Sequence, residues 1–164
     1  ILVESEKGKG TTFRIHFPAA EGTVQEKKIP QKELVLGSGT VLIVDDEPLI
    51  LSLGKEMLTR LGYEVITASS GPEALRVIRE QGPGLDVVIL DMVMPGMGGG
   101  EVFDRLREMD PHIRVLLSSG YSVDGKAQAI LDRGCNGFIQ KPFDLQALSE
   151  KLRQVLQRPA RASR

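Results

Sequence analysis

The chain contains no tryptophan, one cysteine and few aromatic residues, which make up 4% of its 164 residues. The single cysteine, Cys135, excludes an internal disulfide and fits a reducing compartment. No run of 18 or more apolar residues is present, so we expect no membrane-spanning segment. A net charge of −1 gives no general attraction to nucleic acid or to anionic membrane. We therefore expect a cytoplasmic chain that contacts neither and recognises its partners through local surface.

The remaining composition is that of a soluble globular protein, with 41% apolar and 26% charged residues. The length suffices for one domain with a proper core. The chain begins at Ile1 without a methionine, and charges from Glu4 onward interrupt any signal peptide. We expect the sequence to be a piece of a longer protein.

Three segments flank or precede the main domain. In residues 1–18, two short apolar runs are separated by a Lys/Gly stretch, and the second run alternates apolar and polar residues, which predicts a β-hairpin. Residues 19–38 are rich in Glu, Lys, Gln, Gly and Pro and are typical of a linker. Residues 159–164 form a basic tail.

Residues 39–158 alternate short apolar runs with amphipathic stretches of helical spacing. The predicted strands cover 41–44, 64–68, 87–90, 113–117 and 137–139. The predicted helices begin near Pro48 and Gly71, include 102–106 and 127–131, and end with 145–156. Strands that alternate with helices pair in parallel through right-handed crossovers. The pattern predicts an α/β domain with a doubly wound five-stranded parallel sheet and five helices.

Polar residues follow the carboxyl ends of four of these strands. Asp45 and Asp46 follow the first, Asp91 the third, Ser118 and Ser119 the fourth, and Lys141 the fifth. Ligands of open α/β sheets bind beyond these strand ends. Clustered carboxylates favour a hard cation such as magnesium, which with a lysine can neutralise a transferring phosphoryl group. A carboxylate is also a competent covalent acceptor, and a serine hydroxyl can donate to the new group.

At these residues the sequence resembles the receiver (response-regulator) domains of two-component signalling, which have a flavodoxin-like fold. The resemblance rests on four motifs in the family's order: Val41-Leu42-Ile43-Val44-Asp45-Asp46-Glu47-Pro48, Asp91-Met92-Val93-Met94-Pro95-Gly96-Met97-Gly98-Gly99, Ser118-Ser119-Gly120-Tyr121 and Lys141-Pro142-Phe143. It covers the whole of residues 39–158. It implies a phosphorelay function, with a phosphoryl group passing from a phosphohistidine onto an aspartate.

The resemblance assigns roles residue by residue. Asp91 is the phosphoacceptor, and Lys141, before an expected cis proline, pairs with the phosphoryl group. Asp46 is the more direct ligand of magnesium (or manganese), Asp45 acts largely through bound water, and Asp91 and the backbone carbonyl of Val93 complete the protein's share. By its own chemistry, the receiver catalyses only its own phosphorylation and dephosphorylation.

Further roles concern switching and phosphoryl lifetime. Ser119 and Phe138 form the switch pair, in which the hydroxyl moves toward the phosphoryl group and the ring turns inward. Val93 and Tyr121 occupy the positions that tune lifetime, and neither easily positions an attacking water, so we predict slow self-dephosphorylation. Gly98 stands where the family usually has Asp, Asn or Ser, which predicts a poorly capped helix.

Residues 1–18 resemble the last two strands of a histidine-kinase ATP-binding domain, with Gly8, Gly10 and Thr11 near the nucleotide in the parent domain. A receiver after such a domain is typical of hybrid kinases. The resemblance implies a phosphohistidine domain of the same parent chain as donor and a histidine phosphotransfer protein as a possible acceptor. The kinase catalytic core is not contained in this sequence.

Other interpretations remain open at this stage. Asp46 alone could be only a helix N-cap, and Asp91 only a turn residue. A phosphatase of the haloacid dehalogenase type would also use an aspartate nucleophile, but its paired acids lie two residues apart after the first strand. A non-phosphorylated pseudo-receiver that serves only for docking is the third possibility.

Overall fold

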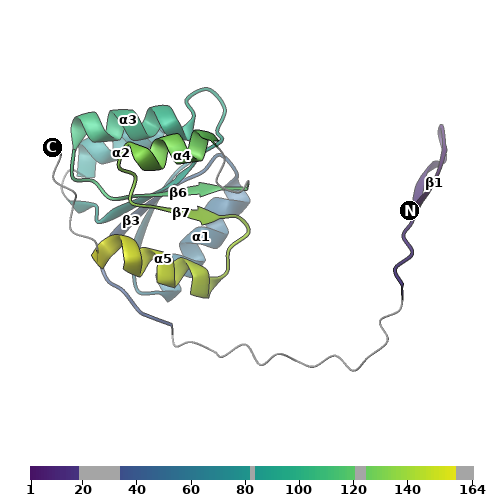
Figure 1. Cartoon of the computed structure of the whole chain (residues 1–164), viewed down its shortest axis with the longest axis horizontal. Coiled ribbons are helices and arrows are strands. Elements are labelled where there is room, and N and C mark those ends of the chain that lie inside the picture. The colour runs from purple at the N-terminus through teal and green to yellow at the C-terminus, as the bar shows by residue number, and fades with distance from the viewer. Residues whose placement is uncertain (19–33, 82–83, 121–124, 158–164) are drawn as a thin grey trace. The chain divides into compact units, whose positions relative to one another are not determined.

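The computed structural model describes residues 1–18, 34–81, 84–120 and 125–157. The chain divides into two compact units, Ile1–Gln31 and Lys32–Arg164 (Figure 1). Most of the expected linker and the whole of the basic tail lie outside the described residues.

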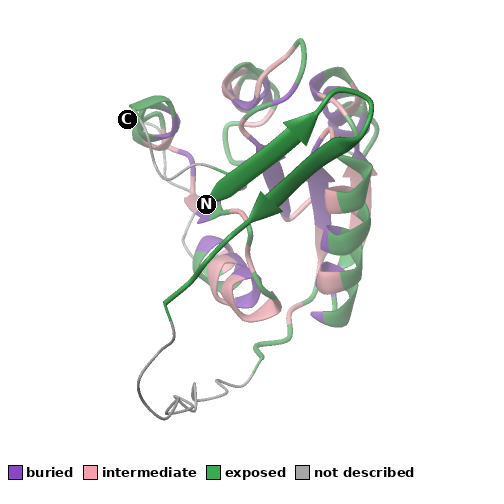
Figure 2. Cartoon of the chain, turned by 90° about the vertical axis from the view of Figure 1, so that its right-hand side faces the viewer, coloured by how far each residue is buried: buried purple, intermediate pink, exposed green. Residues whose placement is uncertain are grey.

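The first unit contains an antiparallel hairpin. Strand β1 (Leu2–Glu6) pairs with β2 (Gly10–Arg14), with Leu2 opposite Arg14. Gly8, in the turn between them, and Gly10, the first residue of β2, have φ of +87° and +102°, a conformation that glycine adopts without steric cost. Every residue of the two strands is exposed, as Figure 2 shows. The predicted hairpin is therefore present.

The second unit is built on one parallel sheet. Its strands are β3 (Thr40–Val44), β4 (Glu64–Ala68), β5 (Val87–Asp91), β6 (Val115–Ser119) and β7 (Gly137–Gln140). Its helices are α1 (Pro48–Arg60), α2 (Gly71–Gln81), α3 (Gly99–Met109), α4 (Gly125–Asp132) and α5 (Leu145–Gln157). The strand order is β4-β3-β5-β6-β7, and all pairs are parallel. The predicted doubly wound α/β fold is confirmed.

The helices cover both faces of the sheet and enclose two hydrophobic clusters (Figure 1). Helices α2, α3 and α4 pack on one face, where Phe103 lies within a cluster that includes Leu90 and Leu117. Helices α1 and α5 pack on the other face, in a cluster that includes Ile89 and Leu116. Burial on both faces explains why the strands read as continuous apolar runs.

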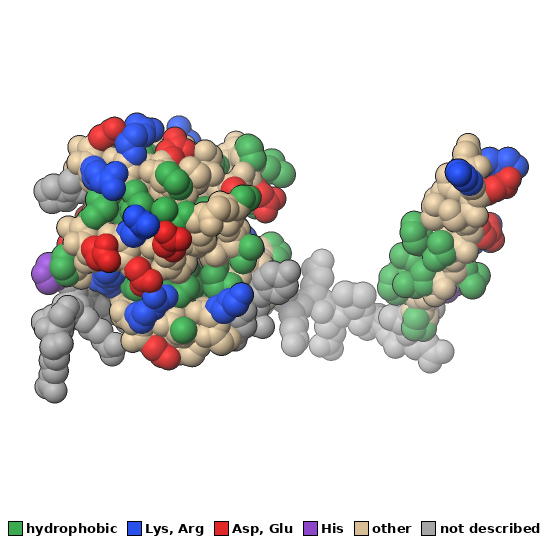
Figure 3. Space-filling model, turned by 90° about the horizontal axis from the view of Figure 1, so that it is seen from above, with side chains coloured by type: hydrophobic (Ala, Val, Ile, Leu, Met, Phe, Trp, Pro, Cys, Tyr) green, Lys and Arg blue, Asp and Glu red, His purple; other side chains and the backbone are tan. Residues whose placement is uncertain are grey.

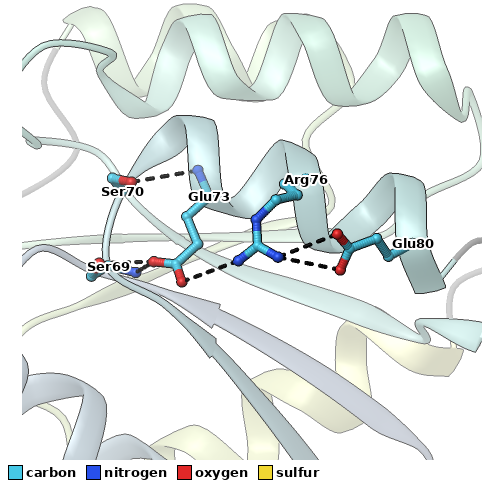
Figure 4. A network of polar contacts seen from close by, with 5 residues as sticks. All are labelled: Ser69, Ser70, Glu73, Arg76 and Glu80. Atoms are coloured by element: carbon cyan, nitrogen blue, oxygen red, sulfur yellow. Dashed lines mark hydrogen bonds and ion pairs between the residues drawn. The ribbon is translucent and has the colours of Figure 1, made fainter.

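The start of α2 shows how the sequence positions a helix beyond a strand end (Figure 4). The backbone N–H and the hydroxyl of Ser69 both donate to the Glu73 carboxylate at 2.8 Å, and the Ser70 hydroxyl accepts from the Glu73 N–H at 3.4 Å. Arg76 then pairs with Glu73 and Glu80 along the exposed face. These contacts satisfy N–H groups that a helix start leaves without partners, so α2 begins at Gly71, as its sequence predicts.

One strand differs from its prediction. Apolar residues begin at Ile113, but β6 begins at Val115. Asp110 forms a turn in which its carboxylate accepts from the His112 N–H at 2.8 Å and its carbonyl accepts from the Ile113 N–H at 3.2 Å. This turn occupies the backbone that would otherwise pair, and the strand starts after it and runs on to Ser119.

Two observations concern the expected absence of membrane and nucleic-acid contacts: the length of the apolar helices and the distribution of surface charge. In the residues that the structure describes, no helix is both long and apolar enough to cross a membrane. On the face seen in Figure 3, basic and acidic side chains are interspersed over the second unit.

Candidate functional site

Two aspartates from neighbouring strands are buried at the carboxyl edge of the sheet. Asp45 directly follows β3, and Asp91 is the last residue of the adjacent β5; they are 2% and 5% exposed. Local backbone holds each carboxylate, because the Glu47 N–H donates to Asp45 Oδ1 at 3.1 Å and the Val93 N–H donates to Asp91 Oδ2 at 2.9 Å. Each carboxylate thus caps the turn that leaves its own strand.

Lys141, which follows β7, joins the two carboxylates. Its Nζ donates to Asp45 Oδ2 at 2.5 Å and to Asp91 Oδ1 at 2.6 Å. The peptide bond between Lys141 and Pro142 is cis, as the resemblance predicted. The structure therefore brings together three residues that are 46 or more positions apart in the chain.

The electrostatics of this triad follow from burial and proximity. Burial raises the pKa of Asp91, and the hydrogen bond and charge of Lys141 oppose that rise only in part. Burial alone would lower the pKa of Lys141, but its hydrogen bonds with Asp45 and Asp91 and their charges outweigh it, so the pKa is raised. The lysine thus stays an ammonium at neutral pH, in contact with both carboxyl groups.

The donor atoms at this edge suit magnesium in kind. Asp45 and Asp91 supply buried carboxylate oxygens, and the half-buried Asp46 lies beside Asp45. Carboxylate and carbonyl oxygens are the ligands that magnesium prefers, and it usually keeps several waters. Among the described residues, however, no three acidic, histidine or cysteine side chains are gathered closely enough to hold a metal ion. In this arrangement the ammonium of Lys141 supplies the positive charge between the carboxylates.

The predicted switch residues lie in the strands beside Asp91. Ser119, at the end of β6, is buried, and Phe138, in β7, is half-buried against the cluster under α2, α3 and α4. Val93 is 60% exposed, and Tyr121 lies outside the described residues.

The glycine-rich loop after β5 leads into α3. The helix begins with Gly98 as its N-cap, without a side-chain hydrogen bond, which confirms the predicted poor capping. The next residue, Gly99, lies so close to the Asp91 carbonyl oxygen that a Cβ there would clash. Glycine at this point therefore lets α3 start directly beside the acceptor strand.

An apolar cleft of about 360 Å³ opens beside the triad. Ile50, Leu53 and Met57 of α1 line it on one side, with Lys141 and Phe143 on the other. Leu53 is 51% exposed. The sequence does not predict this cleft, because an apolar helical stripe does not show which of its edges stays uncovered.

The kinase-like motif of the hairpin forms a small local structure. The hydroxyls of Thr11 and Ser5 lie 2.8 Å apart across the strands, Gly8 lies in the turn and Gly10 begins β2. This geometry is that of a β-hairpin.

Two features of the site go beyond what the sequence predicts. One is the Glu47 N–H, which fixes Asp45. The other is Ser118, whose buried hydroxyl has no hydrogen-bond partner among the described residues. Backbone donors have no sequence signal, and the position of Ser118 at this strand end, which the sequence predicted, does not show that its hydroxyl lacks a partner.

Comparison with known proteins shows that most of the chain is similar to receiver domains. Residues 41–153 match the family model of the response regulator receiver domain. The chain is 33% identical to the sporulation initiation phosphotransferase F of Bacillus subtilis over 116 residues, which cover 71% of this chain and 92% of that protein. The crystal structure of a CheX–CheY–BeF3–Mg²⁺ complex from Borrelia burgdorferi matches with a TM-score of 0.70 at 30% identity, over 73% of this chain and 90% of that chain.

A longer relative matches beyond the sheet domain. The sensor kinase CckA of Brucella abortus is 36% identical over 167 aligned positions, which cover 96% of this chain and 18% of CckA. Several transcriptional regulators match over 119 to 124 residues, and this chain spans 50% to 54% of their length. Most of these relatives thus extend well beyond what this chain contains.

Proposed function

Because this chain belongs to the response regulator receiver family of two-component phosphorelays, we propose that it accepts a phosphoryl group from a phosphohistidine onto Asp91. The observation that carries the proposal is the contact of one ammonium, Lys141 Nζ, with the two buried carboxylates Asp45 and Asp91 at the carboxyl edge of the sheet. A carboxylate can accept a phosphoryl group, provided that positive charge at the site neutralises the incoming oxygens.

In the proposed step, a carboxylate oxygen of Asp91 attacks phosphorus and forms a P–O bond while the P–N bond of the phosphohistidine breaks. The imidazole leaves with the electron pair of that bond. Lys141 is placed to donate to the phosphoryl oxygens, since it already donates to Asp91 at 2.6 Å. Ser119 would donate its hydroxyl to the new group, and Phe138 would change its burial as the switch partner.

The residues that would hold magnesium, or manganese, are Asp45, Asp46, Asp91 and the backbone carbonyl of Val93. When bound, the ion supplies charge that offsets the repulsion between these carboxylates and an incoming phosphoryl group. The position of Asp45 supports this assignment, because its buried carboxylate is held in one orientation by a hydrogen bond from the Glu47 N–H. The exposed Val93 at the lifetime position supports slow hydrolysis, since an apolar side chain does not orient water.

The proposed donor is a phosphohistidine domain of a kinase, in the same parent chain. The alignment with the sensor kinase CckA supports it, because it covers 96% of this chain and thus includes residues before the receiver. We assign residues 1–18 to the end of a kinase ATP-binding domain, 19–38 to a linker, 39–158 to the receiver and 159–164 to a tail. Onward transfer to a histidine phosphotransfer protein and a cytoplasmic location belong to the same proposal. The apolar cleft beside Lys141 favours a protein partner, since apolar surface at a reaction site is available for packing.

The test is the intact mass of the protein after incubation with acetyl phosphate and magnesium. We expect one added phosphoryl group on the wild type and on the control Asp132→Asn, whose carboxyl lies on exposed α4. Asp91→Asn, or omission of the metal, should abolish the adduct. A folded wild type without an adduct would refute phosphorylation and favour the docking-only alternative.

A further inference from the structure

The hydroxyl of Ser118 is buried without a partner. The residue is 2% exposed, and among the described residues its Oγ neither donates nor accepts a hydrogen bond. Most buried polar side-chain atoms in folded proteins have a partner, because an unpaired one carries its full desolvation cost. The contacts of the described residues do not explain why this buried hydroxyl is retained without a partner.

Strand alternation places Ser118 on the same face of the sheet as Asp91. Ile89 and Leu116 lie in the cluster under α1 and α5, whereas the residues that follow each of them lie in the other cluster. Asp91 and Ser118 come two positions after Ile89 and Leu116, so both face the α1 and α5 layer. The two residues are also direct register partners, one on β5 and the other on β6.

The side chain of Lys141 extends from the end of β7, past β6, to Asp91 on β5. Lys141 follows β7, and its Nζ reaches Asp91 on β5 and Asp45 beyond β3. In the sheet, β6 lies between β7 and β5, and the Lys141 N–H donates to the Ser119 carbonyl of β6 at 2.7 Å. Lys141 starts one position beyond the register pair Ser119–Gln140, and its side chain reaches past β6 to Asp91, the register partner of Ser118.

We propose that Ser118 is a second hydroxyl donor to the phosphoryl group, and that its partner is a phosphoryl oxygen on Asp91. This inference rests on the proposed phosphorylation of Asp91 and goes beyond the single switch hydroxyl assigned to Ser119. A phosphoryl group adds three strong acceptor oxygens beside Asp91, the register partner of Ser118. The unpaired hydroxyl is thus a cost in the resting state that phosphorylation removes, so it shifts the balance toward the phosphorylated state.

The test compares stability without ligand and affinity for beryllofluoride with magnesium, a mimic of the phosphoryl group. Ser118→Ala should leave the melting temperature of the free protein unchanged or raise it, since the variant removes an unpaired group. The same variant should bind beryllofluoride about tenfold more weakly, the loss that one hydrogen bond of about 1.4 kcal/mol produces. Ser118→Thr, which keeps the hydroxyl, should restore the affinity.

A matched control is Ser149→Ala on α5. That serine is also buried, at 4% exposure, but its hydroxyl has a partner, because it donates to the Val35 carbonyl at 2.9 Å. The control should lower the melting temperature and leave the beryllofluoride affinity unchanged. Equal affinity of Ser118→Ala and wild type, or a free Ser118→Ala that melts lower than wild type, would overturn the inference while leaving phosphorylation intact. A wild type that binds no beryllofluoride and gains no phosphoryl mass would overturn both.

Discussion

Removal of the Lys141 ammonium tests the electrostatic design of the site most directly. In Lys141→Met, a side chain of similar length keeps the stem but leaves Asp45 and Asp91 without the donor that contacts each of them. Their side chains are 3% and 7% exposed, so water replaces little of the lost interaction. We expect the variant to be less stable than wild type.

The magnitude follows from the burial of the three groups. Loss of one partner of a buried ion pair costs about 3–5 kcal/mol, because the remaining charge is uncompensated. The Lys141 side chain is 16% exposed, which places this site near the lower end, at about 3 kcal/mol. For a domain of this size, that corresponds to a fall in melting temperature of about 12 °C.

The assay is urea or thermal unfolding in magnesium-free buffer, followed by circular dichroism. Lys55→Met, which removes the same charge from an exposed position of α1, is the control and should change stability by less than about 0.5 kcal/mol. Equal stability of the two variants would refute the view that the carboxylates depend on this ammonium. Added magnesium should recover part of the loss only in Lys141→Met.

The pH dependence of the same pair has a definite sign. The pKa of Lys141 is raised above its ordinary value of 10.5, so its stabilising contribution is complete below pH 10.5 and is lost as pH rises through the raised value. The pKa of Asp91 is also raised, so ionisation of this carboxyl costs stability as pH rises from 3.8 through the folded value. The difference in stability between wild type and Lys141→Met should therefore be full from neutrality to pH 10.5 and should be lost as the pH rises through the raised pKa of Lys141.

Three further variants test the supporting structure, each by urea unfolding. Gly98→Asn should raise stability by about 0.5–1 kcal/mol, because the asparagine side chain can cap α3. The backbone accepts it, since φ is −73° and a Cβ would lie 3.7 Å from the Met92 carbonyl oxygen. No gain in stability would refute the capping argument. Gly37→Ala should lower stability by about 1–3 kcal/mol, because its Cβ would collide with the Tyr63 phenol, and a neutral result would show that this segment moves freely. Glu73→Gln should be less stable than wild type above pH 4.5, the ordinary pKa of the carboxyl group, because the Ser69 hydrogen bonds lower the pKa of Glu73. This contribution is lost as the pH falls through the lowered pKa of the folded protein. A pH-independent difference in stability would contradict this.

The sheet could be predicted because its chemistry is local and repetitive. The central strands contain continuous apolar runs, such as Val87 to Leu90 in β5, and only burial on both faces makes such a run stable in water. The carboxyl ends of parallel strands meet at one edge, so the order of elements alone placed Asp91 and Lys141 together before any distance was known.

Other features depend on contacts that the sequence pattern does not contain. The start of β6 at Val115 is set by the Asp110 turn, which competes with strand pairing over two residues. The two adjacent aspartates look equivalent in sequence, yet Asp45 alone of the pair is buried and bonded to Lys141, because the Glu47 N–H orients its carboxylate.

One ammonium links the resting site to its proposed product. With Lys141 donating to both Asp45 and Asp91, the resting site is neutralised by a group that can turn toward a phosphoryl oxygen without leaving the edge of the sheet. Once it does so, Asp45 loses a donor and the Ser118 hydroxyl gains an acceptor. The proposed phosphorylation would therefore exchange one set of buried hydrogen bonds for another, at Asp45 after β3 and at Ser118 in β6. Because the exchange is distributed over several strands, loss of the Ser118 hydroxyl should weaken beryllofluoride binding without abolishing it, whereas Lys141→Met should reduce it far more.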